Sequence, residues 1–202
     1  MGRQLHIGAV IPAAGLSSRM GRFKPLLPFG DRTVIEHAVS TPLAVCDTAV
    51  AVLGKRSDEL RELLSRFGDR LIITENPDFA STDMLTSIQL GVRALPDCDA
   101  FFLVPADMPL IAESTYRALV NAFDGSAEAL IPTFGGRRGH PPLISASLIP
   151  EILGYTGEGG LRAILSRHTV REIPVEDRGC TVDLDTPADY EALKQSNHPI
   201  SP

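Results

Sequence analysis

The residues best suited to chemistry lie in one short stretch near the start of the chain, residues 13–27 (AAGLSSRMGRFKPLL). Three small residues, Ala13, Ala14 and Gly15, let a ligand approach the backbone closely. Backbone N–H groups in such a loop can form a nest for an anion, and basic side chains add phosphate contacts. The stretch therefore predicts a polyphosphate cradle. The residues that we expect to form it are Ala13, Ala14, Gly15, Ser17, Ser18, Arg19, Gly21 and Lys24.

This cradle matches neither of two familiar phosphate-binding patterns. Five residues separate Gly15 from Gly21, and Arg22 follows, whereas a Walker A loop has four residues and then a lysine. The G-x-G-x-x-G pattern of dinucleotide-binding proteins is also absent from the stretch. From composition alone, a basic turn exposed to water stays an alternative.

Three aspartates stand where they could face a bound ligand. Asp107 follows the apolar residues 100–105, and a carboxylate beyond the end of a strand can reach a ligand over the sheet. Asp183 and Asp185 alternate, so on a strand they would share one face. Mg²⁺ prefers one or two carboxylates together with phosphate oxygens. The alternative for each aspartate is to cap a turn or a helix, and Asp189 is expected to do so.

Strands and helices must alternate along the chain to position these residues. This alternation is typical of an α/β fold with a mostly parallel sheet and helices on both faces, which binds ligands beyond the carboxyl ends of its strands. We expect one domain over residues 1–202, with a frayed tail at 195–202 and a loop at 135–142. The expected strands are residues 6–12, 48–53, 71–75, 100–105, 129–133, 143–145 and 170–175, and the expected helices are 33–40, 57–67, 84–95, 114–123, 148–153, 161–167 and 186–194.

Composition narrows the class of protein. The chain has 19 basic and 25 acidic residues, a net charge of −6, which disfavours a sequence-independent nucleic-acid binder. Its apolar runs fall well short of the ~20 residues that span a bilayer, so no membrane partner is expected. The three cysteines, Cys46, Cys98 and Cys180, are far apart, which is typical of reduced thiols and predicts a cytoplasmic protein.

The order of motifs resembles that of the MobA-like nucleotidyltransferases. The loop from Ala13 to Lys24 is similar to their signature loop, and its Ala-Ala-Gly form resembles the molybdenum cofactor cytidylyltransferase branch; the guanylyltransferase branch typically carries Ala-Gly-Gly. One departure is Asp83, which stands where the family usually has glycine. The resemblance continues at Asn76-Pro77, Met84 to Ser87-Ile88 and Gly91, Ala106-Asp107-Met108-Pro109, and residues 136–141 and 183–189.

The resemblance implies a fold and a set of roles. The fold would be a three-layer, Rossmann-like sheet of the nucleotide-diphospho-sugar transferase type. The activity would be Mg²⁺-dependent nucleotidyl transfer, with Asp107 and Asp185, or Asp183 in its place, as metal ligands. Lys24 and Arg19 would contact the phosphates. Asn76 and Ser87 would lie near the base, and Arg137, Arg138 and His140 would bind the acceptor. Met84 and Phe79 are expected to be packing residues, with stacking on the base as the alternative.

The same resemblance implies CTP as the nucleotide and the phosphate of molybdopterin as the acceptor, with pyrophosphate released. A maturation factor for a molybdenum enzyme would then be a partner. Three alternatives stay open. The acceptor could be a sugar or polyol phosphate, the nucleotide could be GTP, or the chain could bind a nucleotide or cofactor without turnover.

Overall fold

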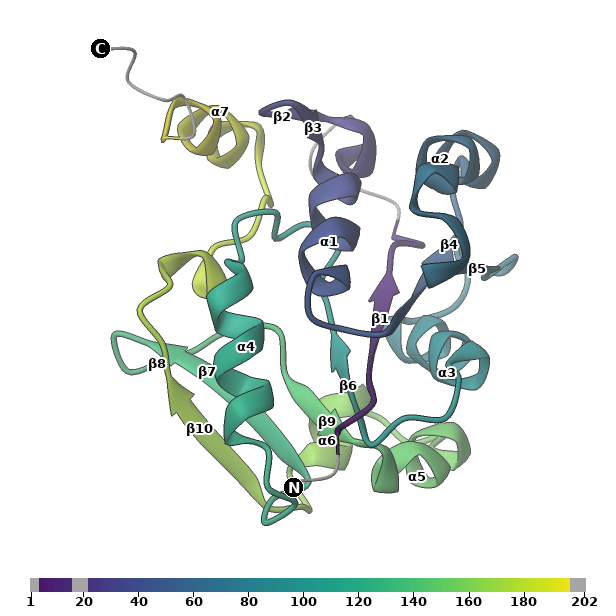
Figure 1. The fold of residues 1–202 in the computed structure, drawn as a ribbon. Helices are drawn as coiled ribbons and strands as arrows, with labels where there is room; N and C mark the ends of the chain where they lie inside the picture. Colours follow the sequence, from purple (N-terminus) through teal and green to yellow (C-terminus); the bar gives the residue numbers. More distant parts are fainter. Residues whose placement is uncertain (1–3, 16–21, 197–202) are drawn as a thin grey trace.

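The computed structural model describes residues 4–15 and 22–196, and an eight-stranded sheet runs through the middle of them (Figure 1). The strand order is β10-β7-β9-β6-β1-β4-β5, and β8 pairs with β7. The pairs between β1, β4, β5 and β6 that lie side by side are parallel, whereas β9 runs antiparallel to β6 and β7. The strands are β1 (Ile7–Pro12), β4 (Thr48–Leu53), β5 (Leu71–Glu75), β6 (Ala100–Leu103), β7 (Ala129–Phe134), β8 (Arg137–Arg138), β9 (Leu143–Ser145) and β10 (Val170–Pro174).

Helices cover both faces of the sheet, which confirms the predicted α/β class. On one face, α1, α2 and α4 pack over side chains such as Ala9 and Ile11, and α1 and α4 lie in front of the strands in Figure 1. On the other face, α3, α5 and α6 pack over Val10 and Val52. The helices are α1 (Val34–Leu43), α2 (Ser57–Leu64), α3 (Met84–Ala94), α4 (Glu113–Ala122), α5 (Ile149–Gly154), α6 (Gly160–Leu165) and α7 (Pro187–Ser196).

The central strands bury side chains on both faces because alternate residues point to opposite helical layers. On the second face, α3 lies very close to the sheet. A Cβ on Gly91 would lie 2.4 Å from Cγ1 of Val10 and 2.9 Å from Cγ2 of Val52. Any larger residue at Gly91 would therefore push α3, and the loop before it, away from the strands.

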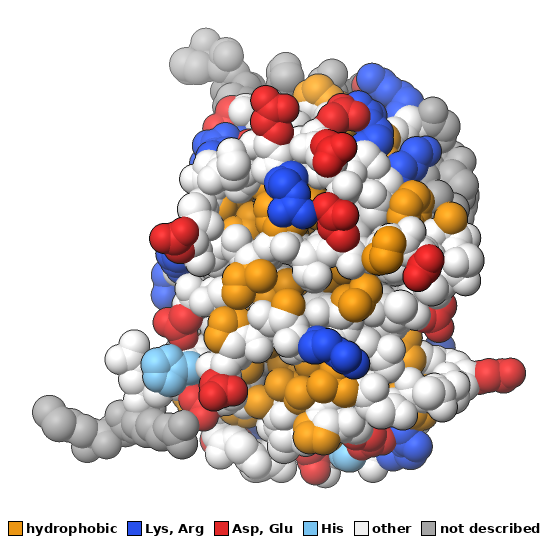
Figure 2. All heavy atoms as spheres, turned by 90° about the vertical axis from the view of Figure 1, so that its right-hand side faces the viewer, with side chains coloured by type: hydrophobic (Ala, Val, Ile, Leu, Met, Phe, Trp, Pro, Cys, Tyr) orange, Lys and Arg blue, Asp and Glu red, His pale blue; other side chains and the backbone are white. Residues whose placement is uncertain are grey.

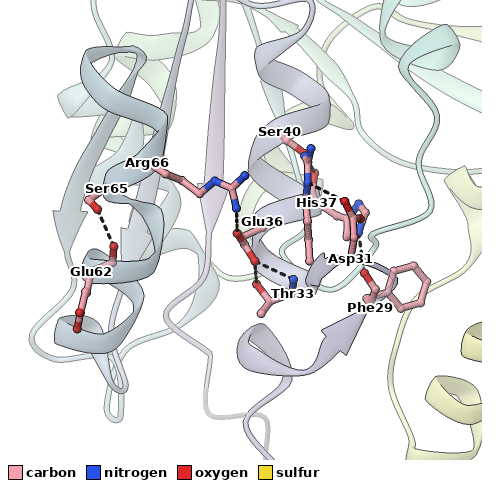
Figure 3. A network of polar contacts seen from close by, with 10 residues as sticks. Phe29, Asp31, Thr33, Glu36, His37, Ser40, Glu62, Ser65 and Arg66 are labelled. Atoms are coloured by element: carbon pink, nitrogen blue, oxygen red, sulfur yellow. Dashed lines mark hydrogen bonds and ion pairs between the residues drawn. The ribbon is translucent and has the colours of Figure 1, made fainter.

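A small hairpin connects the start of the chain to α1. It consists of β2 (Pro28–Phe29) and β3 (Arg32–Thr33), and it follows the 3₁₀ turn η2 (Lys24–Leu26). Figure 3 shows how side chains hold it. The carboxylate of Glu36 accepts hydrogen bonds from N and Oγ1 of Thr33, both at 2.8 Å, and pairs with Arg66 at 2.6 Å. Nε2 of His37 lies 2.9 Å from the carbonyl oxygen of Phe29.

Glu36 is a buried carboxylate that stays charged because of these contacts. Burial alone would raise its pKa, but the hydrogen bonds from Thr33 and Arg66 hold the pKa of Glu36 below its ordinary value. The Thr33–Glu36 pair is a capping box, which fixes the first turn of α1 and the direction from which the hairpin enters it. These contacts therefore hold the β2–β3 hairpin, and η2 before it, in a fixed position against α1.

Several predicted boundaries were wrong. The helix predicted from residue 57 is preceded by Arg56, which has a left-handed φ of 56°, and it gives way at Ser65 to the 3₁₀ segment η3 (Ser65–Arg70). The helix predicted from 114 begins at Glu113. The predicted loop 135–142 contains β8, and the helix α7 continues through the first two residues of the predicted frayed tail. The rest of that tail, residues 197–202, lies outside the described residues.

The side of the molecule with β5, α2 and α3 is shown as spheres in Figure 2. Hydrophobic side chains lie there between charged ones. The strand β5 is an edge of the sheet, and an ion pair of 2.6 Å between Arg61 and Glu75 lies at its end. In the described part of the chain, no helix has the length and apolar character needed to cross a membrane.

Candidate active site

A cavity of about 330 Å³ opens at the carboxyl ends of β1 and β6. Parallel strands end together there, and this edge of a sheet is where α/β proteins commonly bind ligands. The cavity is lined by residues after β1, in η2, at the start of α3, after β6 and in the loop before β9, namely Pro12, Ala13, Gly15, Lys24, Pro25, Met84, Leu103, Val104, Pro105, Ala106, Asp107 and His140.

Lys24 is the central charged group of this cavity. Its Nζ lies 2.9 Å from Oδ1 of Asp185 and 3.3 Å from Oδ2 of Asp107. The lysine side chain is only 11% exposed, whereas the two aspartates are exposed to 35% and 37%. One ammonium group thus lies between two carboxylates that come from distant parts of the sequence, and the three side chains carry a net charge of −1.

The backbone brings the two carboxylates together. Asp107 follows β6, where the N–H of Val104 donates to the carbonyl oxygen of Val10 at 2.9 Å. The N–H of Leu184 then donates to the carbonyl oxygen of Asp107 at 3.0 Å, which fixes the neighbouring Asp185 beside it. The Leu184 side chain is fully buried.

Asp183 and Asp185 do not lie on a strand, so they do not share a strand face. These residues have no regular structure; they lie between η5 (Arg178–Thr181) and α7. Asp183 is exposed, and Thr186 and Asp189 make capping contacts at the start of α7. The N–H and Oγ1 of Thr186 donate to Oδ2 of Asp189 at 2.8 and 2.7 Å. The structural role expected of Asp189 is therefore confirmed.

His140 lines the same cavity as Lys24 and Asp107. The backbone N–H of His140 donates to the carbonyl oxygen of Cys180 at 2.7 Å, and this bond connects the loop that carries His140 to η5. Nearby protein atoms partly desolvate the imidazole and hold the pKa of His140 below its ordinary value, although the residue is exposed and Asp107 and Asp183 act in the opposite direction. A neutral imidazole at pH 7 offers one hydrogen-bond donor and one acceptor.

Asn76 and Ser87, which the family resemblance assigns to the base, have their polar groups turned toward each other. Nδ2 of Asn76 donates to Oγ1 of Thr82 at 2.9 Å and to Oγ of Ser87 at 3.1 Å. Oδ1 of Asn76 accepts from the N–H of Asp78 at 3.1 Å. Asn76 is 2% and Ser87 4% exposed, and neither lines the cavity. This network holds the loop between β5 and α3.

The two arginines expected at the acceptor lie on β8, away from the cavity lining. Both side chains are exposed. Nε of Arg138 donates to Oε1 of Glu172 on β10 at 2.7 Å. Of the three residues assigned to the acceptor, the structure therefore brings only His140 to Lys24 and Asp107.

Other predicted residues can be placed in part. Ala13 and Gly15 line the cavity, and Ala14 is buried next to it. Ser17, Ser18, Arg19 and Gly21 lie outside the described residues. Met84, which we expected to pack in the core, is 60% exposed and lines the cavity. A signal for this was available, because Met84 directly follows Asp83, whose carboxylate caps α3 by accepting from the N–H of Thr86.

The donor set suits a hard divalent cation bound together with phosphates. Among the described residues, no three His, Cys, Asp or Glu side chains converge to hold a metal alone. Asp107 lines the cavity, and Asp185 contacts the same Lys24 ammonium group, so two carboxylates lie close together beside the cavity. Mg²⁺ and Mn²⁺ accept such incomplete sets and complete them with phosphate oxygens and water.

Comparisons with known proteins show the family of the chain. The chain matches the MobA-like NTP transferase domain over residues 9–173. It is 30% identical to the molybdenum cofactor cytidylyltransferase of Escherichia coli, covering 94% of this chain and 96% of that protein. It is 29% identical to a probable molybdenum cofactor guanylyltransferase of Synechococcus elongatus, covering 95% and 100%.

A solved structure gives the same fold. The Rv0371c protein of Mycobacterium tuberculosis, determined in complex with manganese, is similar with a TM-score of 0.74 and 26% identity, and the match covers 95% of this chain and 99% of that one. The match to the family model includes Lys24, Asp107 and His140 and ends before Asp185. The chain therefore belongs to the MobA-like NTP transferase family, a family of nucleotidyltransferases.

Proposed function

We propose that this nucleotidyltransferase transfers CMP from CTP to the phosphate of molybdopterin, with Mg²⁺ and with release of pyrophosphate. The observation that carries the proposal is the position of Lys24 between Asp107 and Asp185 in a cavity at the carboxyl ends of the strands. A triphosphate and an acceptor phosphate both need positive charge there, and the net charge of −1 on the three side chains favours the binding of a cation.

The residues of the chain would act by position and charge. An oxygen of the acceptor phosphate attacks the α-phosphorus, a new P–O bond forms, and the bond to the β-phosphate breaks so that pyrophosphate leaves. The attacking oxygen is already ionised, so no general base is needed, and catalysis comes from orientation and neutralised charge. Lys24 would neutralise charge at the α-phosphate, and Arg19 would bind the leaving phosphates.

Asp107 and Asp185 would hold Mg²⁺, which when bound neutralises phosphate oxygens as a Lewis acid. Asp183 is the less favoured second ligand because its side chain is exposed, although its charge acts on His140. His140 would contact the acceptor from the cavity wall. Arg137 and Arg138 lie on β8, so they would reach only those parts of an acceptor that extend beyond the cavity.

CTP is favoured by the Ala13-Ala14-Gly15 form of the loop and by the similarity to a cytidylyltransferase. GTP is the second candidate, because relatives of nearly the same identity are named guanylyltransferases. Molybdopterin as acceptor follows from the names of both kinds of relative. A maturation factor as partner follows from this acceptor alone. Transfer to a sugar or polyol phosphate, and binding without turnover, are the remaining alternatives.

Thermal unfolding with Mg²⁺ and each of CTP, GTP, ATP and UTP tests the nucleotide. A ligand present at about 100 times its Kd stabilises by ~2.7 kcal/mol, which is roughly 5–10 °C for a chain of this size. We expect a shift with CTP that is lost in Asp107→Ala. A shift with GTP alone would replace CTP in the proposal, and no shift with any of the four would contradict it. Pyrophosphate release with a panel of phosphorylated acceptors then separates the acceptors and separates turnover from binding.

A further inference from the structure

A small hydrophobic cluster lies apart from the two cores that cover the sheet. We call it the C-terminal cluster; it consists of Leu27, Phe29, Val34, Leu184 and Tyr190. The first three of these follow Lys24 along the chain, and the other two stand on either side of Asp185. The cluster therefore joins the segment that carries Lys24 to the segment that carries Asp185.

Tyr190 makes a polar contact between the two segments. Its side chain is buried, with 5% exposed, and its hydroxyl donates to the carbonyl oxygen of Pro28 at 2.5 Å. Pro28 is the first residue of β2, so the bond ties α7 to the hairpin, and Figure 1 shows α7 beside β2 and β3. On the hairpin side, the Glu36 and His37 contacts of Figure 3 hold Thr33 and Phe29 in place.

The ion pair between Lys24 and Asp185 does not by itself explain why the two segments stay together. A pair in which the aspartate is 37% exposed stabilises little, because water screens it and two flexible side chains must be ordered. Burial of Leu184 and Tyr190 removes much more apolar surface from water. The cluster thus holds the segments, and the ion pair takes the geometry that the cluster sets.

We propose that Tyr190 is a positioning residue of the active site. Its hydroxyl fixes α7 on the β2–β3 hairpin and so sets the 2.9 Å separation between Nζ of Lys24 and Oδ1 of Asp185. This inference rests on the proposed function for its catalytic consequence. The family model matches residues 9–173, so the inference means that a residue outside the matched part helps to position the active site.

The test compares two tyrosines that make the same kind of bond. Tyr190→Phe removes only the hydroxyl and leaves the apolar ring in the cluster. The matched control is Tyr155→Phe, because the Tyr155 hydroxyl also donates to a backbone carbonyl, that of Glu158 at 2.7 Å, next to α5 on a distant part of the fold. Both variants are measured for pyrophosphate release with CTP, Mg²⁺ and molybdopterin, or with the nucleotide and acceptor that the proposed function experiment selects.

We expect Tyr190→Phe to lower kcat by about tenfold and to change the KM for the nucleotide by less than about twofold, since small displacements of a catalytic group mainly affect the chemical step. We expect Tyr155→Phe to match the wild type. If Tyr190 acts through Asp185, its effect disappears in an Asp185→Asn background, so the double variant should be as slow as Asp185→Asn alone. Additive losses, or an unchanged kcat in Tyr190→Phe, would overturn the inference.

Amide hydrogen exchange gives a readout that does not need activity. The N–H of Leu184 bonds to Asp107, so its exchange reports how firmly the Asp185 segment is held. We expect at least about tenfold faster exchange at Leu184 in Tyr190→Phe, with Val104 in the sheet unchanged and with no effect in Tyr155→Phe. Unchanged exchange at Leu184 would contradict the positioning role even if the protein transfers no nucleotide. If Leu184 exchanges faster in Tyr190→Phe but the wild type transfers no nucleotide, the positioning role stands and only the proposed function is refuted.

Discussion

Titratable side chains line a hollow at each end of the sheet, and the two groups of side chains make different contacts. At the carboxyl end, a cavity of about 330 Å³ contains Lys24, Asp107 and His140. At the amino end, a hollow of about 180 Å³ is lined by residues that include His6, Asp47, Asp97 and Cys98. Composition alone would rank the amino end as an equal candidate site.

Hydrogen bonds separate the two ends. At the amino end, Oδ2 of Asp47 accepts from the N–H of Ile7 at 3.0 Å, and Oδ2 of Asp99 accepts from the N–H of His6 at 2.9 Å. These carboxylates satisfy backbone groups at the start of β1. At the carboxyl end, by contrast, Lys24 and Asp107 line the cavity, and the Lys24 ammonium group contacts the carboxylates of both Asp107 and Asp185. Convergence of side chains, more than their number, makes the carboxyl end the candidate active site.

The largest effect should come from Lys24→Ala. Removing the ammonium group takes away positive charge at the phosphates, and losses of this type lower turnover by about 100-fold or more. The fold should persist, because the carboxylates of Asp107 and Asp185 are each more than a third exposed and stay hydrated when the ammonium group is gone. Steady-state pyrophosphate release and the thermal unfolding midpoint measure the two quantities. Lys55→Ala is the control, since Lys55 is exposed and does not line the cavity. Normal turnover in Lys24→Ala would reject its role.

Asn76→Ala should instead lower the stability of the fold. The Asn76 amide bonds to Thr82, to Ser87 and to the N–H of Asp78, and breaking a buried network of this kind costs about 2 kcal/mol. We expect the affinity for CTP, measured by calorimetry below the unfolding transition, to change by less than about threefold. A loss of CTP affinity far larger than this would show that Asn76 contacts the base, as the sequence pattern suggested.

Asp47→Ala tests the amino end. The variant loses the acceptor for the N–H of Ile7, which should cost about 1 kcal/mol. For a chain of this size, that lowers the unfolding midpoint by about 2–4 °C. Turnover at 25 °C should stay at the wild-type level. A large loss of turnover with an unchanged midpoint would mean that the amino end has a direct part in the reaction.

The smallest effect concerns the Cys98 thiol at the amino end. Burial, with a further contribution from Asp99, raises the pKa of Cys98 from its ordinary value of 9.0 to about 11. At pH 8 it should therefore react with iodoacetamide about 100-fold more slowly than a free thiol, because the thiolate is the nucleophile. Mass spectrometry of the Cys98 peptide measures this rate, and alkylation as fast as that of free cysteine would contradict it.

The same shift in the pKa of Cys98 makes stability depend on pH. The folded thiol keeps its proton between pH 9 and 11, whereas the unfolded one loses it. The contribution of this thiol to stability is therefore complete below pH 9 and is lost as the pH rises toward 11. Denaturant unfolding of the wild type and of Cys98→Ala over this range should show a shallower decline in the variant.

Much of the fold could be predicted from the sequence, because its strands are continuous apolar runs buried between two helical layers. Asp107 was found in the same way, from its place after one of these runs. The alternation of Asp183, Leu184 and Asp185 did not indicate a strand: Leu184 is buried in the C-terminal cluster, and its N–H bonds to a single carbonyl. No sheet neighbour is involved.

The hydrogen-bond and ion-pair partners of individual side chains could not be predicted in the same way. Asn76 resembles a base contact, yet its amide groups bond within its own loop. Arg138 pairs with Glu172, a residue 34 positions away. Lys24 and Asp185 are 161 positions apart in the sequence. Their contact in space depends on Tyr190 and Leu184, which no local pattern connects to a phosphate loop.

The most direct test of the central claim is the binding of Mn²⁺ in the presence of CTP, followed by the electron paramagnetic resonance signal of free Mn²⁺. Wild type and Asp47→Ala should bind Mn²⁺ equally. Asp107→Ala should bind at least about tenfold more weakly, a loss that even an outer partner of a metal ligand typically causes. If Asp107→Ala binds Mn²⁺ as tightly as the wild type, the metal and the triphosphate are not held at the carboxyl end of the sheet.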